Sequence, residues 1–474
     1  MTKPEDEAMV KLEDEDIQGF MFSSYARYLH CAAYLLLRIT DPEPSRRWLG
    51  ELTDKITTGK QKSKEERRKE IFALNIAFTS NSLKNLGFSE KELSGFSRPF
   101  QEGMVTEARA KTLSDTGDSD PQNWNWGSLG NPVDILLMVF AVDENVLAEQ
   151  LKLRRAEIVA CGGLQEIIIL PQAGRQPDMK EHFGYLDGVG QPVIEGSGKA
   201  QNQLRRTGHA TVIKAGEFIL GYENELGVLD GVPGAGEMPE FGVNGTYLVF
   251  RQMEQHVSAF WNFLEEATCR PDGTSDPDAR ERLGAKIVGR WKSGAPVTRY
   301  PDRDPFQGEP QKTDENDFGY DEHDKYGFGC PIGAHIRRAN PRDSLPPNPE
   351  TALKSAKRHR LIRQGRSYGD HAENVFIEDN KERGLYFICL NSDIERQFEF
   401  TQQTWINNKK FGGLYDEVDP LIGRHKSDNL FTVQEDPLRT RVHNLRKFVT
   451  IKGGSYFFMP GISALRYVAG LKNS

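Results

Sequence analysis

The order of apolar and helical segments constrains the fold of this chain most strongly. Four apolar runs with strand character occupy the first half, and helical patterns follow the first and the third of them. The runs span residues 34–40, 72–79, 133–142 and 164–170, and the helices span 45–56 and 143–155. Ser45, which follows two prolines, is predicted to cap the first helix. The order strand, helix, strand, strand, helix, strand is that of a split βαβ, or ferredoxin-like, unit.

The second half contains a similar series, although no letter-level repeat relates it to the first. Strands are predicted at residues 217–222, 247–253, 385–391 and 448–458, and helices at 255–266 and 393–407. A chain of 474 residues is too long for one small core. We therefore expect an α+β fold of two ferredoxin-like domains with antiparallel sheets, at residues 1–200 and 201–474. The seam is expected within residues 195–205, which are rich in Gly, Gln and Asn.

Composition narrows the class of partner. A net charge of −8 argues against a nucleic-acid surface, which needs clustered Lys and Arg. The acidic N-terminus lacks the apolar segment of a secretory signal, and the longest apolar runs are far shorter than a membrane span. Five cysteines without framework spacing favour reduced thiols. We therefore expect a cytoplasmic protein that binds neither nucleic acid nor a membrane.

Three distant segments carry residues suited to one chemical site. Residues 184–192 hold Asp187 in a Gly-rich turn, residues 330–343 hold His335 in an Arg-rich stretch, and residues 360–369 hold Arg363. An acid, an imidazole and a guanidinium are what a haem peroxidase needs around its iron. Each residue alone has a simpler interpretation: an Asp-Gly turn, a structural histidine and a surface ion pair. A zinc site at Cys330 and His335 lacks two further ligands.

The three segments occur together in the order, and within the motifs, of the dye-decolorizing peroxidase family, which the chain resembles. The motifs are G-x-x-D-G, C-P-x-x-A-H-I-R-R-x-N-P-R-D and I-R-x-G-x-x-Y-G. Further matching stretches cover nearly the whole chain, among them residues 73–79, 100–104, 115–126, 289–291, 384–391 and 452–460. The long inserts and the helix at 397–400 are similar to the larger, highly active branch of the family.

The resemblance implies one haem b per chain, held between the sheet and helices. His335 would be the axial ligand of the iron, with Asp187 and Arg363 on the opposite, peroxide-binding side. Residues matching the haem lining of relatives are Gly188, Val189, Gly190, Asn340, Pro341, Arg342, Arg363, Leu385 and Phe387. Arg337, Arg338 and Arg342 are expected to neutralise the haem propionates. A carboxylate normally holds the proximal imidazole N–H, and Asp419 is the candidate.

The implied function is reduction of hydrogen peroxide with oxidation of aromatic dyes and phenols. Trp405 and Tyr368 stand where relatives carry surface radicals, although the helical spacing of Trp405 with Phe398 and Gln402 is equally compatible with a core position. The alternative function is a non-catalytic haem-binding or iron-releasing protein. That protein would keep His335 without needing both Asp187 and Arg363. The oligomeric state stays open between monomer and homodimer.

Overall fold

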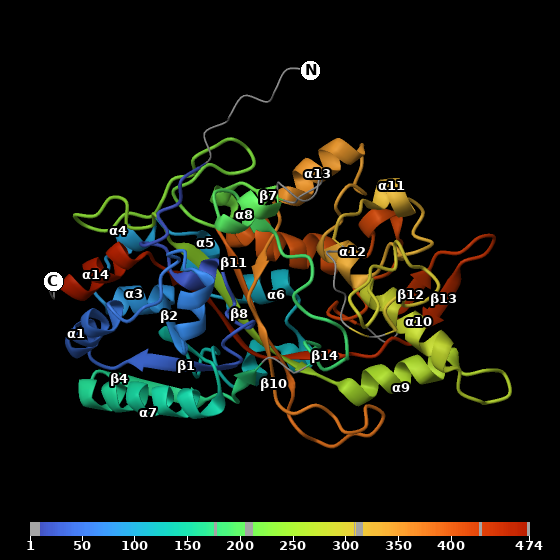
Figure 1. Cartoon of the computed structure of the whole chain (residues 1–474), viewed down its shortest axis with the longest axis horizontal. Coiled ribbons are helices and arrows are strands. Elements are labelled where there is room, and N and C mark those ends of the chain that lie inside the picture. Colours follow the sequence, from blue (N-terminus) through green and yellow to red (C-terminus); the bar gives the residue numbers. More distant parts are fainter. Residues whose placement is uncertain are drawn as a thin grey trace.

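The structure, a computed structural model, describes residues 10–174, 178–203, 212–307, 309, 316–425 and 429–471. Its strands form the centre of the molecule. Helices α1, α3, α7 and α14 lie at one end of the sheet, and α9 to α12 lie at the other (Figure 1). Within the described ranges, no helix is long and apolar enough to cross a membrane.

The first half forms the predicted ferredoxin-like unit. Its strands are β1 (Cys31–Ile39), β2 (Phe72–Phe78), β3 (Ile135–Ala141) and β4 (Leu164–Ile169), in the antiparallel order β4-β1-β3-β2. The two helices between them are α1 (Pro42–Thr53) and α7 (Glu144–Cys161). The predicted cap at Ser45 is wrong. Asp41 caps α1 by accepting a hydrogen bond from the Glu43 N–H, since Pro42 and Pro44 are both tolerated in a first helical turn.

The second half repeats the same strand order. Its strands lie side by side in the spatial order β14 (Val449–Met459), β8 (Thr246–Gln255), β11 (Gly384–Asn391) and β9 (Ile362–Arg363). Helix α9 (Val257–Thr268) follows β8. The predicted strand at 217–222 is wrong. This stretch forms a 3-10 turn, η4 (Ala215–Glu217), and then bends at Gly221, whose φ is +89°.

The second strand of this unit instead comes from the 360–369 motif, as β9 and β10 (Arg366–Tyr368). The predicted helix at 393–407 forms, but with π-type turns, as η5 (Ile394–Glu399) and η6 (Thr401–Ile406). The remaining elements are mostly short. They are η1 (Gly19–Met21), α2 (Lys64–Lys69), α3 (Ser80–Asn85), α4 (Glu90–Leu93), α5 (Arg98–Glu102), α6 (Glu107–Leu113), η2 (Gly117–Ser119), η3 (Pro121–Asn123), β5 (Ala173–Gly174), β6 (Val193–Ile194), α8 (Gly198–Gln203), β7 (Val212–Ile213), α10 (Pro277–Val288), α11 (Tyr320–Asp324), α12 (His335–Ala339), α13 (Pro349–Lys357), η7 (Phe411–Gly413), β12 (Leu430–Val433), β13 (Thr440–His443) and α14 (Ile462–Gly470).

The two units share one sheet, which closes into a barrel. On one side β2 pairs with β14 at Phe78 and Phe458, and on the other β5 joins β1 to β10, which pairs with β11. Alternate side chains of the strands therefore face either the barrel interior or the helices outside. The predicted domain boundary near residue 200 lies at α8, and residues 204 and 205 of the predicted seam lie outside the described residues.

Both faces of the barrel wall are apolar. The interior is filled by buried aromatic and aliphatic side chains, including Tyr34, Phe140, Phe250 and Tyr386. The outer face of the first unit is covered by α1, α7 and α14. On the outer face of the second unit, Leu385 and Phe387 of β11 stay partly exposed, and there the candidate site lies.

Candidate active site

His335 and Asp419 form a pair on the helical side of this site. His335 is the first residue of α12, and its Nδ1 lies 2.9 Å from Oδ2 of Asp419. Asp419 is fully buried, and its other oxygen accepts hydrogen bonds of 2.9 Å from the N–H groups of Leu421 and Ile422. The pairing places the ring proton on Nδ1. The other ring nitrogen, Nε2, has no hydrogen-bond partner among the described residues and is left to act as a ligand.

The environment keeps the Asp419 carboxylate charged. Burial by itself would raise the pKa of Asp419, but His335 and the Ile422 N–H more than offset this, and the pKa lies below its usual value. An ionised carboxylate raises the basicity of the imidazole to which it is hydrogen-bonded. The predicted proximal partner is therefore in place, and the remaining nitrogen of His335 is a strong donor for iron.

Two arginines of the motif have structural roles, contrary to prediction. Arg338 is completely buried, and its guanidinium donates to the carbonyls of Trp405, Asn408 and Glu417 at 2.7–3.0 Å. Arg337 donates to the Cys330 carbonyl at 2.8 Å and contacts Asp324. Because the hydrogen bonds of both guanidinium groups go to protein acceptors, neither group is available to propionates. Arg338 instead ties α12 to η6 and to the loop that leads to Asp419.

Asp187 lies in the Gly-rich loop on the sheet side. Gly188 and Gly190 have φ values of +77° and +83°, which only glycine adopts without strain. The Asp187 side chain is exposed, and its Oδ1 accepts the N–H of Gly188 at 2.6 Å. No cationic side chain in the described part of the chain pairs with it. The turn thus presents a carboxylate that the protein itself does not neutralise.

Arg363 binds this loop directly, so two of the predicted segments meet. Its Nη2 donates to the Val189 carbonyl at 2.8 Å, and its backbone N–H donates to Gln191 Oε1 at 3.1 Å. The Gln191 amide also donates to the Arg363 carbonyl. Arg363 pairs across β9 and β11 with Cys389, two residues along the strand from Phe387, so its side chain shares a face with Phe387 and Leu385.

A cluster of arginines joins the two sides of the site. Arg342, just after α12, lies close enough to Arg290 and Arg360 for their charges to interact, and Arg363 interacts with the same two residues. Burial, followed by the charges of Arg342 and Arg363, lowers the pKa of Arg360 to about 9. Burial and then Arg342 lower the pKa of Arg290 to about 10. Within the described residues, no carboxylate pairs with Arg290, Arg360 or Arg363.

Since no described carboxylate pairs with Arg290, Arg360 or Arg363, these three groups need an anionic occupant, because like charges repel in a buried setting. Arg360 also reaches the Gly-rich loop, donating to the Gly190 carbonyl at 2.7 Å. Asn316 accepts from Arg290 at 2.7 Å through its side chain and from Arg342 at 2.7 Å through its carbonyl. The arrangement suits a ligand with carboxylates at one edge and an apolar plane.

The comparisons with known proteins agree with this geometry. A family model for the DyP dimeric alpha+beta barrel domain matches residues 16–161. Dye-decolorizing peroxidase msp1 of Mycetinis scorodonius is 31% identical over 476 residues, which covers 96% of this chain and 87% of the relative. A dye-decolorizing peroxidase of Mycena epipterygia is 32% identical, over 84% of this chain and 76% of the relative. The chain belongs to the dye-decolorizing peroxidase family.

The fold match extends over the whole length. The structure of an ancestral D-type dye-decolorizing peroxidase aligns with a TM-score of 0.79 and 27% identity, covering 98% of this chain and all of that chain. Peroxidases of the dye-decolorizing family bind haem, and the chain is an oxidoreductase of this class. The site fits that group on three counts. The Nε2 atom of His335 has no hydrogen-bond partner among the described residues, no described carboxylate pairs with Arg290, Arg360 or Arg363, and Leu385 and Phe387 are half-exposed.

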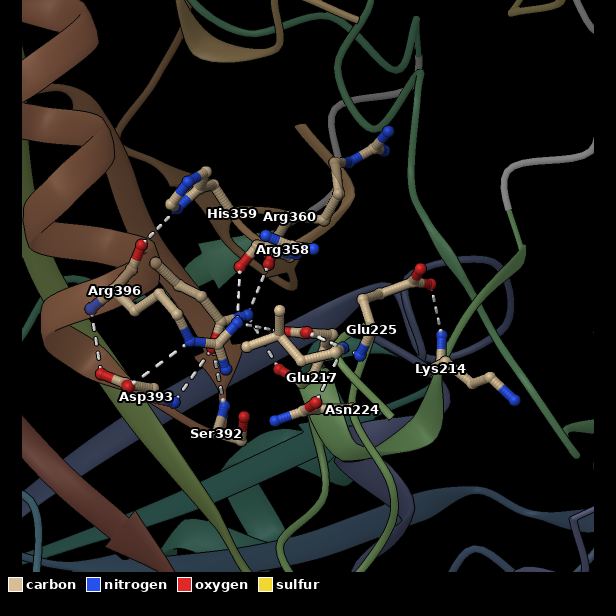
Figure 2. A network of polar contacts seen from close by, with 12 residues as sticks. Lys214, Glu217, Asn224, Glu225, Arg358, His359, Arg360, Ser392, Asp393 and Arg396 are labelled. Carbon is tan, nitrogen blue, oxygen red and sulfur yellow. Dashed lines mark hydrogen bonds and ion pairs between the residues drawn. The ribbon is translucent and has the colours of Figure 1, made fainter. Parts of the chain in front are cut away.

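A buried polar network fixes the backbone at Arg360, one arginine of the dye-decolorizing peroxidase site (Figure 2). The Gln397 amide donates to the carbonyls of Arg360 and Glu217, both at 2.8 Å. Glu217, which is fully buried, pairs with Arg396, and Arg396 donates to the Arg358 carbonyl at 3.0 Å. The backbone of residues 358–360 is therefore fixed by η5 and η4 together. The motif signals found Arg363 but missed Arg290 and Arg360, although both stand inside matching stretches.

The two proposed surface radicals do not lie at the surface. Trp405 is 4% exposed and Tyr368 is 1% exposed. Trp405 packs edge-on against His359 and Phe400 with ring centroids 5.1 and 5.4 Å away, and Tyr368 stacks on Tyr386 inside the barrel. The helical spacing of Trp405 indicated a core position, and that alternative is the one the structure confirms.

Proposed function

We propose that the chain binds one haem b, with the iron ligated by His335, and that it reduces hydrogen peroxide while oxidising dyes and phenols. Arg290, Arg342, Arg360 and Arg363 would neutralise the propionates. When bound, the haem supplies the electrons that break the peroxide bond and regains them one at a time from donors. The observation that carries the proposal is that Arg363 contacts the Asp187 loop while His335 is held by a buried carboxylate.

Asp187 acts as the acid–base group for peroxide. Its carboxylate takes the proton from one peroxide oxygen and delivers it to the other, which leaves as water. Arg363 stabilises the negative charge that develops as the O–O bond breaks. Leu385 and Phe387 exclude water from this side, which strengthens both interactions. Gln191 supports the step by holding the Arg363 backbone at both its N–H and its carbonyl.

Peroxide turnover with an electron donor tests the proposal. The purified protein should consume hydrogen peroxide in step with oxidation of an anthraquinone dye or a methoxylated phenol. A related peroxidase has been solved with bound 2,6-dimethoxyphenol, which makes that phenol a suitable first donor. A protein that retains haem but turns over no donor in a broad panel would instead be the non-catalytic haem-binding alternative.

A further inference from the structure

A cavity lies beside the loop that carries Asp187. Its volume is about 340 Å³, within the range of small-molecule sites. Gln191 and Ile362 line it, and the Gln191 side chain also hydrogen-bonds to the Arg363 backbone. The N-terminal segment around Phe22, the turn before α2, and β6 with the start of α8 also line it. The cavity is therefore separate from the peroxide-binding side but shares a wall with it.

The charge of this cavity favours an anion. Four cationic side chains and two carboxylates line it: Lys60, Lys62, Arg67, Lys199, Asp14 and Glu70. Lys60 pairs with Glu15 and Lys62 pairs with Glu70 at 2.6–2.8 Å. No carboxylate in the described part of the chain pairs with Arg67 or Lys199, and Lys199 donates only to the Phe22 carbonyl, at 2.9 Å. Both side chains are exposed, and two lining cations without a carboxylate partner among the described residues attract anionic ligands.

Two tyrosines form part of the cavity wall. Tyr28 is half-buried and Tyr25 is fully buried, and their rings meet edge to face with centroids 6.1 Å apart. The Tyr28 hydroxyl contacts the side chains of Ser23 and Glu70, and burial, with the charge of Glu70, raises the pKa of Tyr28 to about 12. The phenol thus stays protonated near neutrality, and Glu70 is placed to take its proton when an electron is removed.

A column of aromatic rings leads from this wall through the barrel interior. From Tyr25 the successive ring centroids are 4.9 Å apart to Phe140, 6.3 Å to Tyr34, 5.2 Å to Tyr386 and 4.4 Å to Tyr368. These rings come from β1, β3, β10 and β11 and from the segment before β1, so the closed barrel brings them together. Four of the five rings are oxidisable phenols, and Phe140 bridges Tyr25 and Tyr34, so an electron has a path of short steps between rings.

The column passes beside the active site at Tyr386. Tyr386 lies between Leu385 and Phe387 in β11 and points to the opposite face, since side chains alternate along a strand. One strand thus separates the column from the apolar pair on the peroxide-binding side. The cavity and the active site are connected by aromatic side chains as well as by the wall at Gln191.

We propose that this cavity binds an anionic phenol, and that Tyr28 passes the electron of that donor inward along the column. This inference rests on the proposed peroxidase function. Tyr28 loses one electron to the column and its proton to Glu70, and it regains the electron from the phenol and the proton from Glu70. The phenol becomes a phenoxyl radical and releases its own proton to solvent. Two phenols are oxidised for each hydrogen peroxide reduced to two molecules of water.

Binding is tested first, with 4-hydroxybenzenesulfonate as the probe. Calorimetric titration of the haem-loaded protein should give a defined affinity. The double variant Arg67→Gln with Lys199→Gln should bind the probe about tenfold or more weakly. The matched control is Lys111→Gln, an exposed lysine on α6, which should leave the affinity unchanged. Equal affinity in the double variant and the wild type overturns the proposed site.

The electron route is tested second, with Tyr28→Phe and the exposed control Tyr415→Phe. Tyr28→Phe should retain the affinity for the sulfonate but lower kcat for it about tenfold or more, and remove one tyrosyl signal from the electron paramagnetic resonance spectrum after peroxide addition. Tyr415→Phe should change none of these. An unchanged kcat and radical spectrum in Tyr28→Phe overturns the route. If the wild-type protein fails to turn over 2,6-dimethoxyphenol as well, the peroxidase proposal itself fails, and the binding result still decides the cavity.

Discussion

Replacing Asp419 with Asn should loosen the haem. In the wild-type site, Oδ1 of Asp419 is committed to the N–H groups of Leu421 and Ile422, and Oδ2 faces Nδ1 of His335 at 2.9 Å. An Asn side chain keeps its oxygen toward the two N–H groups and therefore points its NH2 group at Nδ1. That contact forces the imidazole proton onto Nε2, which is the atom that must bind the iron.

The magnitude follows from the lost hydrogen bond. Hydrogen bonds to charged groups contribute about 1.5–3 kcal/mol, which corresponds to a change of roughly 10- to 100-fold in affinity. We expect haem transfer from Asp419→Asn to excess apomyoglobin, followed at the Soret band, to be faster by that factor. The control is Asp416→Asn, an exposed residue that pairs with Lys409. Equal transfer rates in Asp419→Asn and the wild type would refute the role of this carboxylate.

Three further results are expected. Asp187→Asn and Arg363→Leu should each retain haem but reduce peroxide about 100-fold more slowly in stopped-flow measurements, and unchanged rates in both would remove them from the reaction. Burial lowers the pKa of His182 from 6.5 to about 4, so its contribution to stability is complete above pH 6.5 and is lost as the pH falls toward 4. Denaturant unfolding should therefore show a loss of about 3 kcal/mol over that window that is absent from His182→Gln. Trp405→Ala should lower the unfolding free energy by about 3–5 kcal/mol, since its ring is buried against His359 and Phe400, and a loss below about 1 kcal/mol would contradict the packing.

The first half of the fold was predictable because its strands are long and their apolar runs are continuous. All four runs became strands in the ferredoxin-like order. Barrel closure was not predictable, since it depends on β5 and β10, which have only two and three residues and leave no periodic signal. The same limit explains the error at 217–222. Its apolar residues are buried, but the 3-10 turn η4 and the positive φ of Gly221 bend the backbone.

The candidate site shows a similar division. The motifs located Asp187, His335 and Arg363, and Asp419 was the candidate partner of the imidazole. In the structure, Arg363 contacts the loop of Asp187, and His335 contacts Asp419. They did not distinguish arginines that bind protein carbonyls from arginines that face an anion. Arg338 and Arg342 stand four residues apart in one motif, yet Arg338 points into the helix packing and Arg342 joins the cluster with Arg360. That difference depends on tertiary contacts, which spacing along the chain does not encode.

Haem retention by His335→Ala tests the central claim most directly. The wild-type protein, reconstituted with haem b, should contain one haem per chain with a ferric Soret spectrum of an imidazole ligand. The variant should lose the group on gel filtration and regain the spectrum when free imidazole is added, because Asp419 and the arginine cluster remain. A His335→Ala protein that keeps stoichiometric haem with an unchanged axial-ligand spectrum, without added imidazole, would contradict the assignment of this site.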